Sequence, residues 1–414
     1  MNKINETSRD EAAADAESAV RAARLAGGKA TSSRLWFLVH GWAALPIWGF
    51  LLFVCVTGTI CVLAHEFSWL ANPAARAGDG GGQKPMAFVD VVPLVESQVD
   101  GAKVRYVTQR EPYLAYHVGI AMPGQESAMA YVNPYTGMVQ EVITGRTFRQ
   151  FVRALHGWLL IPFTSGYSLG WWAVSLLSIP LMVSVVTGLV VYKRFWRAYT
   201  RPTLRTGRGA RTLFGDLHRL IGAWSFWFVI VMSLTGGWFL TRAVLGDFTS
   251  IKPFPQAPFV ERADMPTVAP RRDVLADWGG PEASIDRAVA AGMAALPDSK
   301  IRGVILPNTA FNPVLLFTDG RIPLVFERAW INPYTATVIK TARAGDLTAL
   351  QTLGVIAPPL HYGTFAGLIS KLIWFAFGVA MTAMVATGFV IWSKRTAEAT
   401  VGMVRDRRLA LAAE

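Results

Sequence analysis

Four long stretches of the chain are built almost entirely from apolar residues and contain no Asp, Glu, Lys or Arg. They cover about residues 35–64, 169–192, 220–241 and 372–393. Each approaches or exceeds the roughly 20 apolar residues that a helix needs to cross a lipid bilayer. The pattern therefore predicts a multi-pass membrane protein with four transmembrane helices.

The polar segments between these stretches predict the orientation of the chain. The segment KRFWRAYTRPTLRTGRGAR, residues 193–211, has seven basic residues and no acidic one, as is typical of a cytoplasmic loop. We therefore expect both termini on the cytoplasmic side and the segments of about residues 67–150 and 246–355 on the outer side. The apolar run from residue 35 is far longer than a signal-peptide core, so we expect it to remain as a membrane anchor.

The two outer segments share one pattern. In the first, the helix-like run FVDVVPLVESQVDGA precedes three strand-like runs, and in the second SIDRAVAAGMAALPD precedes three more. The sequence NPYT at residues 133–136 returns at residues 332–335, and Asn-Pro favours a turn between strands. Each outer segment is therefore predicted to be an α+β module with one helix and an antiparallel sheet.

The apolar stretches repeat as well. A Thr-Gly pair follows His40 by 17 positions in the first stretch, and another follows His218 by 17 positions in the third. In the second and fourth stretches, LHGW (155–158) and LHYG (360–363) each lead to a further Thr-Gly pair. The order helix, outer module, helix thus occurs twice, which predicts a membrane α-helical fold with a four-helix transmembrane bundle.

The second stretch is too long for one span. From Leu155 to Tyr192 a single helix would measure about 57 Å, nearly twice the hydrocarbon thickness, so we expect a break near Pro162 and a span that starts near Gly170. The expected organisation is a cytoplasmic tail (1–34), transmembrane helix 1 (35–66), outer module 1 (67–146), an interfacial helix with transmembrane helix 2 (147–192), a basic cytoplasmic loop (193–212), transmembrane helix 3 (213–243), outer module 2 (244–355), transmembrane helix 4 (356–393) and a cytoplasmic tail (394–414).

Four of the six histidines occupy repeated positions. His40 and His218 lie near the predicted cytoplasmic ends of two helices, and His156 and His361 lie near the outer ends of the other two. Ionisable groups within a membrane are costly and normally face the bundle interior with a partner. We therefore expect two histidine pairs at two depths.

Neutral imidazole is an axial ligand of haem iron, and two such rings on facing helices would hold one b-type haem. Two pairs would hold two b-type haems, as electron transfer through a membrane requires. The histidines are also compatible with a proton relay, with hydrogen bonds to the backbone or with another metal such as Zn or Cu. The glycines of the Thr-Gly pairs permit helix packing or the approach of a porphyrin.

The other histidines and the cysteines have weaker patterns. His65 is an alternative outer ligand or an interfacial residue, and Glu66 beside it is a candidate hydrogen-bond partner of a ligating imidazole. His117 falls in a predicted strand, where a surface or core role is expected. Cys55 and Cys61 are expected to pack within the first helix, and there is no C-x-x-C-H motif for covalent haem attachment.

Charge and motifs exclude several functions. The net charge of +12 needs no nucleic acid to explain it, because much of the excess lies in the cytoplasmic loop and near the C-terminus. No nucleotide-binding, zinc-protease or serine-hydrolase motif occurs. If electrons cross the membrane, they come from an unknown cytoplasmic partner or a membrane quinol, and Arg197, Arg201 and Arg205 are candidates for docking an acidic donor protein.

Two parts of the sequence resemble a known protein family. The outer modules that end in NPYT resemble PepSY domains, and LHYGTFAGLISKLIWFAFGVAMTAMVATGFVIWSKR resembles the closing helix of PepSY-associated membrane proteins. The likeness extends from about residue 34 to residue 395. Some members of that family are iron-regulated proteins of the bacterial inner membrane, and the best-understood kind is similar to dihaem reductases of ferric siderophores such as ferrioxamine.

The resemblance implies that His40, His218, His156 and His361 ligate two haems and that a ferric siderophore is reduced in the periplasm. Fe(II) is softer than Fe(III) and is held more weakly by hard oxygen donors, so reduction favours release. The redox chemistry belongs to the cofactor, and no catalytic acid or base is expected. Five extra residues at the start of the second span depart from the family pattern, which keeps His65 in contention for the outer haem.

Two other functions remain open from the sequence. The main alternative is a non-enzymatic PepSY membrane protein that binds peptides or regulates a partner enzyme. A transporter with duplicated halves is disfavoured, because both halves have the same orientation and no predicted span carries a buried acid.

Overall fold

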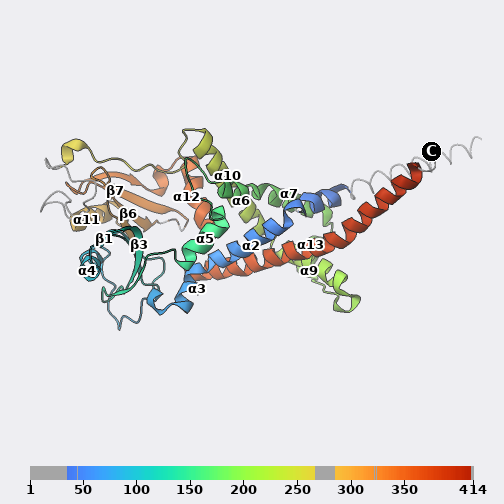
Figure 1. Cartoon of the computed structure of the whole chain (residues 1–414), viewed down its shortest axis with the longest axis horizontal. Coiled ribbons are helices and arrows are strands. Elements are labelled where there is room, and N and C mark those ends of the chain that lie inside the picture. Colours follow the sequence, from blue (N-terminus) through green and yellow to red (C-terminus); the bar gives the residue numbers. More distant parts are fainter. Residues whose placement is uncertain (1–34, 44, 266–284, 321, 323, 412–414) are drawn as a thin grey trace, which may run out of the picture. The chain divides into compact units, whose positions relative to one another are not determined.

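The computed structural model describes residues 35–43, 45–265, 285–320, 322 and 324–411 (Figure 1). The expected N-terminal tail and the last three residues lie outside this part of the chain. The chain divides into two compact units. Unit 1 consists of Met1–Cys55, Leu176–Leu234 and Val379–Glu414, and unit 2 of Val56–Ser175 and Thr235–Gly378.

Three helices of the described chain are long and apolar enough to cross a membrane. They are α6 and α7 taken together (Leu169–Leu176, Ser178–Val191), α10 (Phe226–Phe248) and the first part of α13 (Gly367–Leu411). A fourth candidate is a bent pair formed by the helix Leu35–Ala43 and α2 (Trp48–Val62). The four predicted apolar stretches therefore all appear as helices.

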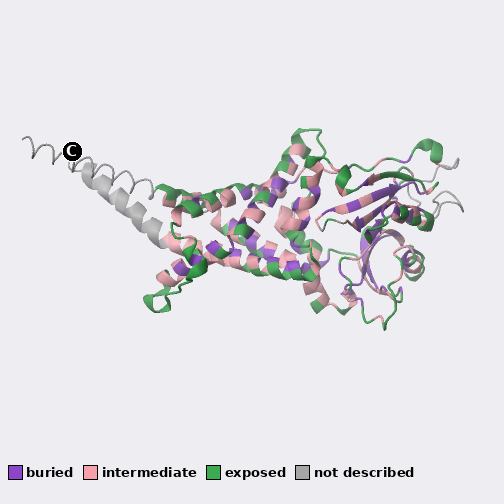
Figure 2. Ribbon diagram, turned by 180° about the vertical axis from the view of Figure 1, so that it is seen from behind, coloured by how far each residue is buried: buried purple, intermediate pink, exposed green. Residues whose placement is uncertain are grey.

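The long helices carry many exposed and half-buried residues, whereas buried residues gather in the strands (Figure 2). On α7, Ile179, Val183, Val186 and Val190 recur every three or four residues and are between 36% and 53% exposed. A stripe of this kind suits contact with lipid tails and would be a liability in water. The chain is a membrane protein, as its apolar pattern predicts.

The first predicted span is broken rather than continuous. The sequence predicts one helix over residues 35–66, but after Ala43 the structure has a 3₁₀ turn at Leu45–Ile47, then α2, then α3 (Ala64–Ala71). The helices on the two sides of the first break are bent by 60°. Pro46 lies in this break, and proline has no amide hydrogen and disfavours helical backbone at the residue before it.

Two short helices carry the outer histidines. They are α5 (Phe148–Trp158), with His156 in its last turn, and α12 (Ala349–Tyr362), with His361 in its last turn. Each begins with a capping box, in which a threonine and a glutamine bind each other's backbone N–H groups. These pairs are Thr147 with Gln150 and Thr348 with Gln351.

The second predicted span is interrupted at the expected place but not by the expected residue. The backbone turns left-handed at Leu159 and Leu160, so α5 ends before Pro162 is reached, and helix resumes in α6. A Cβ atom on Gly170 would lie 1.9 Å from the carbonyl oxygen of Trp158. Only glycine permits this close approach between the start of α6 and the end of α5.

The two outer modules form one eight-stranded antiparallel sheet. Its strands are β1 (Lys103–Thr108), β2 (Tyr116–Met122), β3 (Gln125–Val132), β4 (Val139–Ile143), β5 (Lys300–Ile305), β6 (Val314–Asp319), β7 (Phe326–Ile331) and β8 (Val338–Ala342). The strand order is β4-β3-β2-β1-β5-β6-β7-β8. The sequence predicts a separate sheet in each module, whereas the structure joins them because β1 and β5, otherwise unpaired edges, satisfy each other's backbone groups.

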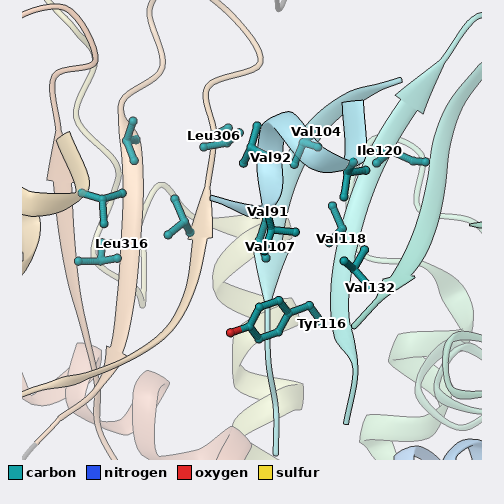
Figure 3. Packing of buried hydrophobic residues seen from close by; sticks show 14 of the residues in the cluster. Val91, Val92, Val104, Val107, Tyr116, Val118, Ile120, Val132, Leu306 and Leu316 are labelled. Atoms are coloured by element: carbon teal, nitrogen blue, oxygen red, sulfur yellow. The ribbon is translucent and has the colours of Figure 1, made fainter. Parts of the chain in front are cut away.

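One apolar core runs through both halves of the sheet. The helices α4 (Val91–Gln98) and α11 (Ile285–Ala295) contribute to it together with alternate residues of the strands. Figure 3 shows Val91 of α4 packed among strand residues such as Val107 and Val118. These side chains lie on one face of the sheet, which is the period-two pattern expected of a half-buried strand.

Candidate functional site

In unit 1, His40 and His218 face each other. His40 belongs to the helix Leu35–Ala43 and His218 to α9 (Ala210–Trp224). Their ring centres are 6.3 Å apart, and the ring planes are inclined by 73°. The pairing of His40 with His218, which the repeat positions predicted, is therefore present in unit 1.

A threonine fixes the orientation of His40. Nδ1 of His40 lies 2.9 Å from Oγ1 of Thr187, and this hydroxyl donates its hydrogen to the carbonyl oxygen of Val183 at 2.6 Å. A hydroxyl has one proton, so the Thr187 oxygen accepts from Nδ1–H of His40. In the neutral ring, Nε2 then carries the free lone pair.

The same argument holds for His218. Its Nδ1 lies 3.0 Å from the carbonyl oxygen of Met384 and 3.3 Å from Oγ1 of Thr387. A carbonyl only accepts, and the Thr387 hydroxyl donates to the carbonyl oxygen of Ala383, so Nδ1 of His218 is the donor. Both histidines of unit 1 thus have the tautomer in which Nε2 can bind a metal.

In unit 2, His156 and His361 form the second pair. Their ring centres are 6.4 Å apart and the planes are inclined by 33°. Nδ1 of His156 lies 3.4 Å from Oγ1 of Thr57, and Nδ1 of His361 lies 2.8 Å from Oγ1 of Thr235. Each of the four histidines therefore meets, through Nδ1, the threonine of a Thr-Gly pair from its own half of the chain.

The glycine of these pairs leaves room for an imidazole. A Cβ atom on Gly58 would lie 2.7 Å from Cε1 of His156, and one on Gly388 would lie 3.1 Å from Cε1 of His218. One on Gly188 would lie 3.4 Å from Cε1 of His40. At these three positions the glycine admits the histidine ring itself, which is a different contact from the porphyrin approach that the sequence suggested.

The spacing of both pairs suits a metal ion held between two imidazoles. A metal–imidazole bond is about 2 Å long, so two nitrogens that bind one ion from opposite sides are about 4 Å apart and the ring centres about 6 Å apart. Two ligands suffice for a haem, because the porphyrin fills the other positions on the iron. In the described part of the chain, no three His, Cys, Asp or Glu side chains come together as a metal-binding group.

His65, the alternative outer ligand, lies elsewhere. Its ring centre is 5.4 Å from that of His117, and His117 in turn lies 5.1 Å from the ring of Tyr131. Burial, with the nearby charges of Arg149 and Arg110, lowers the pKa of His117 to about 3. The structure thus places His156, and not His65, opposite His361, and His117 is a half-buried residue whose lowered pKa keeps it neutral.

Among the described residues, Glu66 hydrogen-bonds a tyrosine and a lysine and not an imidazole, which differs from the role suggested by the sequence. Its Oε1 accepts from the hydroxyl of Tyr113 at 2.7 Å and from Nζ of Lys371 at 2.8 Å. Lys371 also lies 2.7 Å from Oε1 of Glu111 and is 3% exposed. This buried charge cluster went unnoticed in the sequence, because its three charged members come from segments far apart in the chain.

The basic loop contains one arginine that is not free to dock a partner. Arg205 donates two side-chain hydrogen bonds to the buried carboxylate of Asp216, which Arg219 also contacts. Asp216 is 4% exposed and lies within the predicted transmembrane helix 3 (213–243), so the expectation that no predicted span carries a buried acid is wrong. Arg197 and Arg201 are exposed, so they remain the candidates for donor docking, whereas Arg205 has a structural role.

The sequence of the chain matches the model of one protein family. Residues 37–395 match the model of the PepSY-associated TM region. No curated protein matches the chain. The matched segment contains all four paired histidines and both halves of the sheet. The chain therefore belongs to the PepSY-associated transmembrane family, as the closing helix and the NPYT turns suggested.

Proposed function

We propose that this protein is a dihaem oxidoreductase of the bacterial inner membrane that passes electrons to a ferric siderophore on the periplasmic side. The observation that carries the proposal is the histidine geometry. Two pairs have ring centres 6.3 and 6.4 Å apart, and all four rings meet a threonine through Nδ1. A ligating imidazole typically has this second hydrogen bond, which fixes its orientation.

Two pairs of histidines would hold the two cofactors. His40 and His218 would bind one iron, and His156 and His361 the other, each through Nε2. In the described part of the chain, no protein group hydrogen-bonds to Nε2 of His40, His218 or His361. When bound, two b-type haems supply one-electron redox chemistry.

Each repeat would contribute one ligand to each haem. His40 and His156 belong to the first half of the chain, and His218 and His361 to the second. Reduction of the acceptor takes one electron per Fe(III), which a cytoplasmic protein or a membrane quinol would supply. Oxygen donors hold the resulting Fe(II) more weakly, so the iron would leave its ligand.

The absorption spectrum of the purified full-length protein, oxidised and reduced, tests the proposal. We expect a Soret band, sharp reduced α bands and two haems per chain after expression with adequate haem. His40→Ala and His361→Ala should each lose about one haem, because each removes one axial ligand. His65→Ala is the matched control and should retain two haems, since His65 belongs to neither pair.

One result would count against this function, and another would change only the assignment of the outer ligands. A purified wild-type protein without haem bands would remove the redox function and favour the non-enzymatic PepSY module. Loss of a haem from His65→Ala together with retention of both haems in His156→Ala would assign the outer site to His65.

A further inference from the structure

A cavity of about 490 Å³ lies between one face of the sheet and α5 in unit 2. Its walls come from β1, β2 and β3, from the connection between β4 and α5, and from α5 itself. The volume is within the range of about 300–1,000 Å³ that is usual for small-molecule sites. Ala154 and Trp158 line the cavity two residues before and two residues after His156 along α5, and His156 itself is not a lining residue. The cavity and the outer histidine pair therefore lie against different faces of the same helix.

The cavity is strongly basic. Arg105, Arg146 and Arg153 line it, no Asp or Glu does, and Ser127 and Gln150 add neutral polar groups. Among the described residues, none of the three arginines forms a salt bridge. A guanidinium group is charged at any physiological pH and binds carboxylates through two parallel hydrogen bonds.

Arg105 has a counterpart in the second half of the sheet. The runs KVRY in β1 and KIRG in β5 place Arg105 and Arg302 at matching β-bulges. A bulge redirects its side chain out of the regular alternation of the strand. The two arginines therefore leave their strands in the same way, and they can be compared directly.

The two halves differ in what neutralises this arginine. Nε of Arg302 lies 2.6 Å from Oδ2 of Asp319. Asp319 pairs with Lys300, and the equivalent pairing in the first half joins Lys103 to Ala121. Arg105 thus has no carboxylate where its counterpart has one, and its buried Nε has no hydrogen-bond partner among the described residues.

Further positive charge surrounds the cavity. The guanidinium of Arg153 lies 5.5 Å from the ring of Trp158, which holds it in the cavity wall. Burial and the positive charges of Arg110 and Arg153 lower the pKa of Arg149 to about 10. The charges repel one another, and a bound anion would relieve the repulsion.

We propose that this cavity binds an anionic Fe(III) complex whose free carboxylates are held by Arg105, Arg146 and Arg153. The inference rests on the proposed reductase function. It specifies the electron acceptor as a ferric complex that bears carboxylates, rather than a neutral or cationic ferric complex. A haem held by the outer histidine pair would then supply one electron to an acceptor that lies against the same helix, α5. The phosphate of an anionic lipid is the competing ligand for these arginines.

Binding of ferric citrate to the full-length protein in phosphatidylcholine nanodiscs tests the proposal. We expect ferric citrate to bind at least tenfold more tightly than cationic ferrioxamine B, and its affinity to fall as salt rises. Arg105→Gln with Arg153→Gln should weaken binding of ferric citrate by about tenfold to a hundredfold. Arg262→Gln changes an exposed arginine outside the cavity and should leave it within about twofold.

A second variant keeps all the arginines. Ala121→Asp places a carboxylate where Asp319 lies in the other half, so Arg105 gains an internal partner and the affinity for ferric citrate should fall. Equal binding of the two iron complexes, or unchanged affinity in both variants, would overturn the proposal. It would also be overturned if adding phosphatidylglycerol to the nanodiscs abolished ferric citrate binding, because the arginines would then be a lipid site.

These outcomes are separable from failure of the haem proposal. Binding of ferric citrate is measured on the oxidised protein and requires no electron. The cavity variants leave all four paired histidines in place, so their haem spectra should match that of the wild-type protein. A protein that lacks haem yet binds ferric citrate would reject the reductase and retain the anion site.

Discussion

The single proton of a threonine hydroxyl determines what the neighbouring histidine can do. The hydroxyl of Thr187 donates its only hydrogen bond to the carbonyl oxygen of Val183, one helical turn earlier. His40 must therefore donate to Thr187 through Nδ1, and Nε2 of His40 is left with a lone pair. The Thr-Gly pairs can be found in the sequence, but the histidine that each threonine contacts cannot. Which histidine faces which threonine depends on helix packing, which the spacing of residues along one helix does not reveal.

Gly58→Ala tests the fit between these helices at a single position. The added methyl group would lie 2.7 Å from Cε1 of His156, so the ring must move, and we expect loss of about one haem of two. Gly49→Ala is the control on the same helix, since a Cβ atom there has no neighbour within 4 Å. Haem-to-protein ratios and reduced spectra measure the effect. Two haems with unchanged spectra in Gly58→Ala would show that the ring position is not critical.

At the scale of the element, the short helix α5 carries His156 in its last turn and is capped at its first turn by Thr147. An isolated helix of 11 residues is marginal without tertiary contacts and caps. Thr147 is 8% exposed and accepts from the backbone N–H of Gln150. The N-cap therefore contributes to the position of His156 about two and a half turns away.

Thr147→Ala should destabilise α5 by about 1 kcal/mol, because an N-terminal N–H loses its acceptor. Thr147→Ser retains a hydroxyl and should restore most of the loss. Amide hydrogen exchange over Phe148–Trp158 is the measurement, and faster exchange is expected in the alanine variant alone. Identical exchange in both variants would show that tertiary packing holds the helix without its cap.

The sequence predicted which helices and strands exist better than it predicted where each one ends or which strands pair with each other. The apolar stretches and the repeated NPYT turns identified the helices and both halves of the sheet. The bend near Pro46 was missed, since a long apolar run masks a local break. The break in the second stretch was predicted, but at Pro162 rather than at the left-handed turn of Leu159 and Leu160. The joining of β1 to β5 was also missed, because alternation specifies which face of a strand is buried and leaves the choice of partner open.

At the scale of the whole molecule, one buried cation links segments that are far apart in the sequence. Lys371, at the start of α13, lies between Glu66 of α3 and Glu111 of the connection between β1 and β2. The two carboxylates are 13% and 11% exposed, so each needs its partner. Conversely, the lysine would be costly to bury without them.

Lys371→Met should destabilise the protein by about 3–5 kcal/mol, because it leaves two buried carboxylates without a counter-ion. Thermal unfolding of the purified protein measures this loss. Lys103→Met is the matched control: its bridge to Glu96 joins side chains that are 38% and 27% exposed and should contribute less than about 1 kcal/mol. Combining Lys371→Met with Glu66→Gln and Glu111→Gln should recover much of the stability. Equal losses in the two lysine variants would contradict the role assigned to the cluster.

The division of labour among the histidines has a consequence for biosynthesis. Each half of the chain orients its own two rings through its own threonines, yet each pair needs one ring from each half. A ribosome that has made only the first half has therefore completed neither pair: His40 gains its partner only with α9, and His156 gains its partner only with α12. In the proposed dihaem protein, the haem between His156 and His361 would therefore be inserted last.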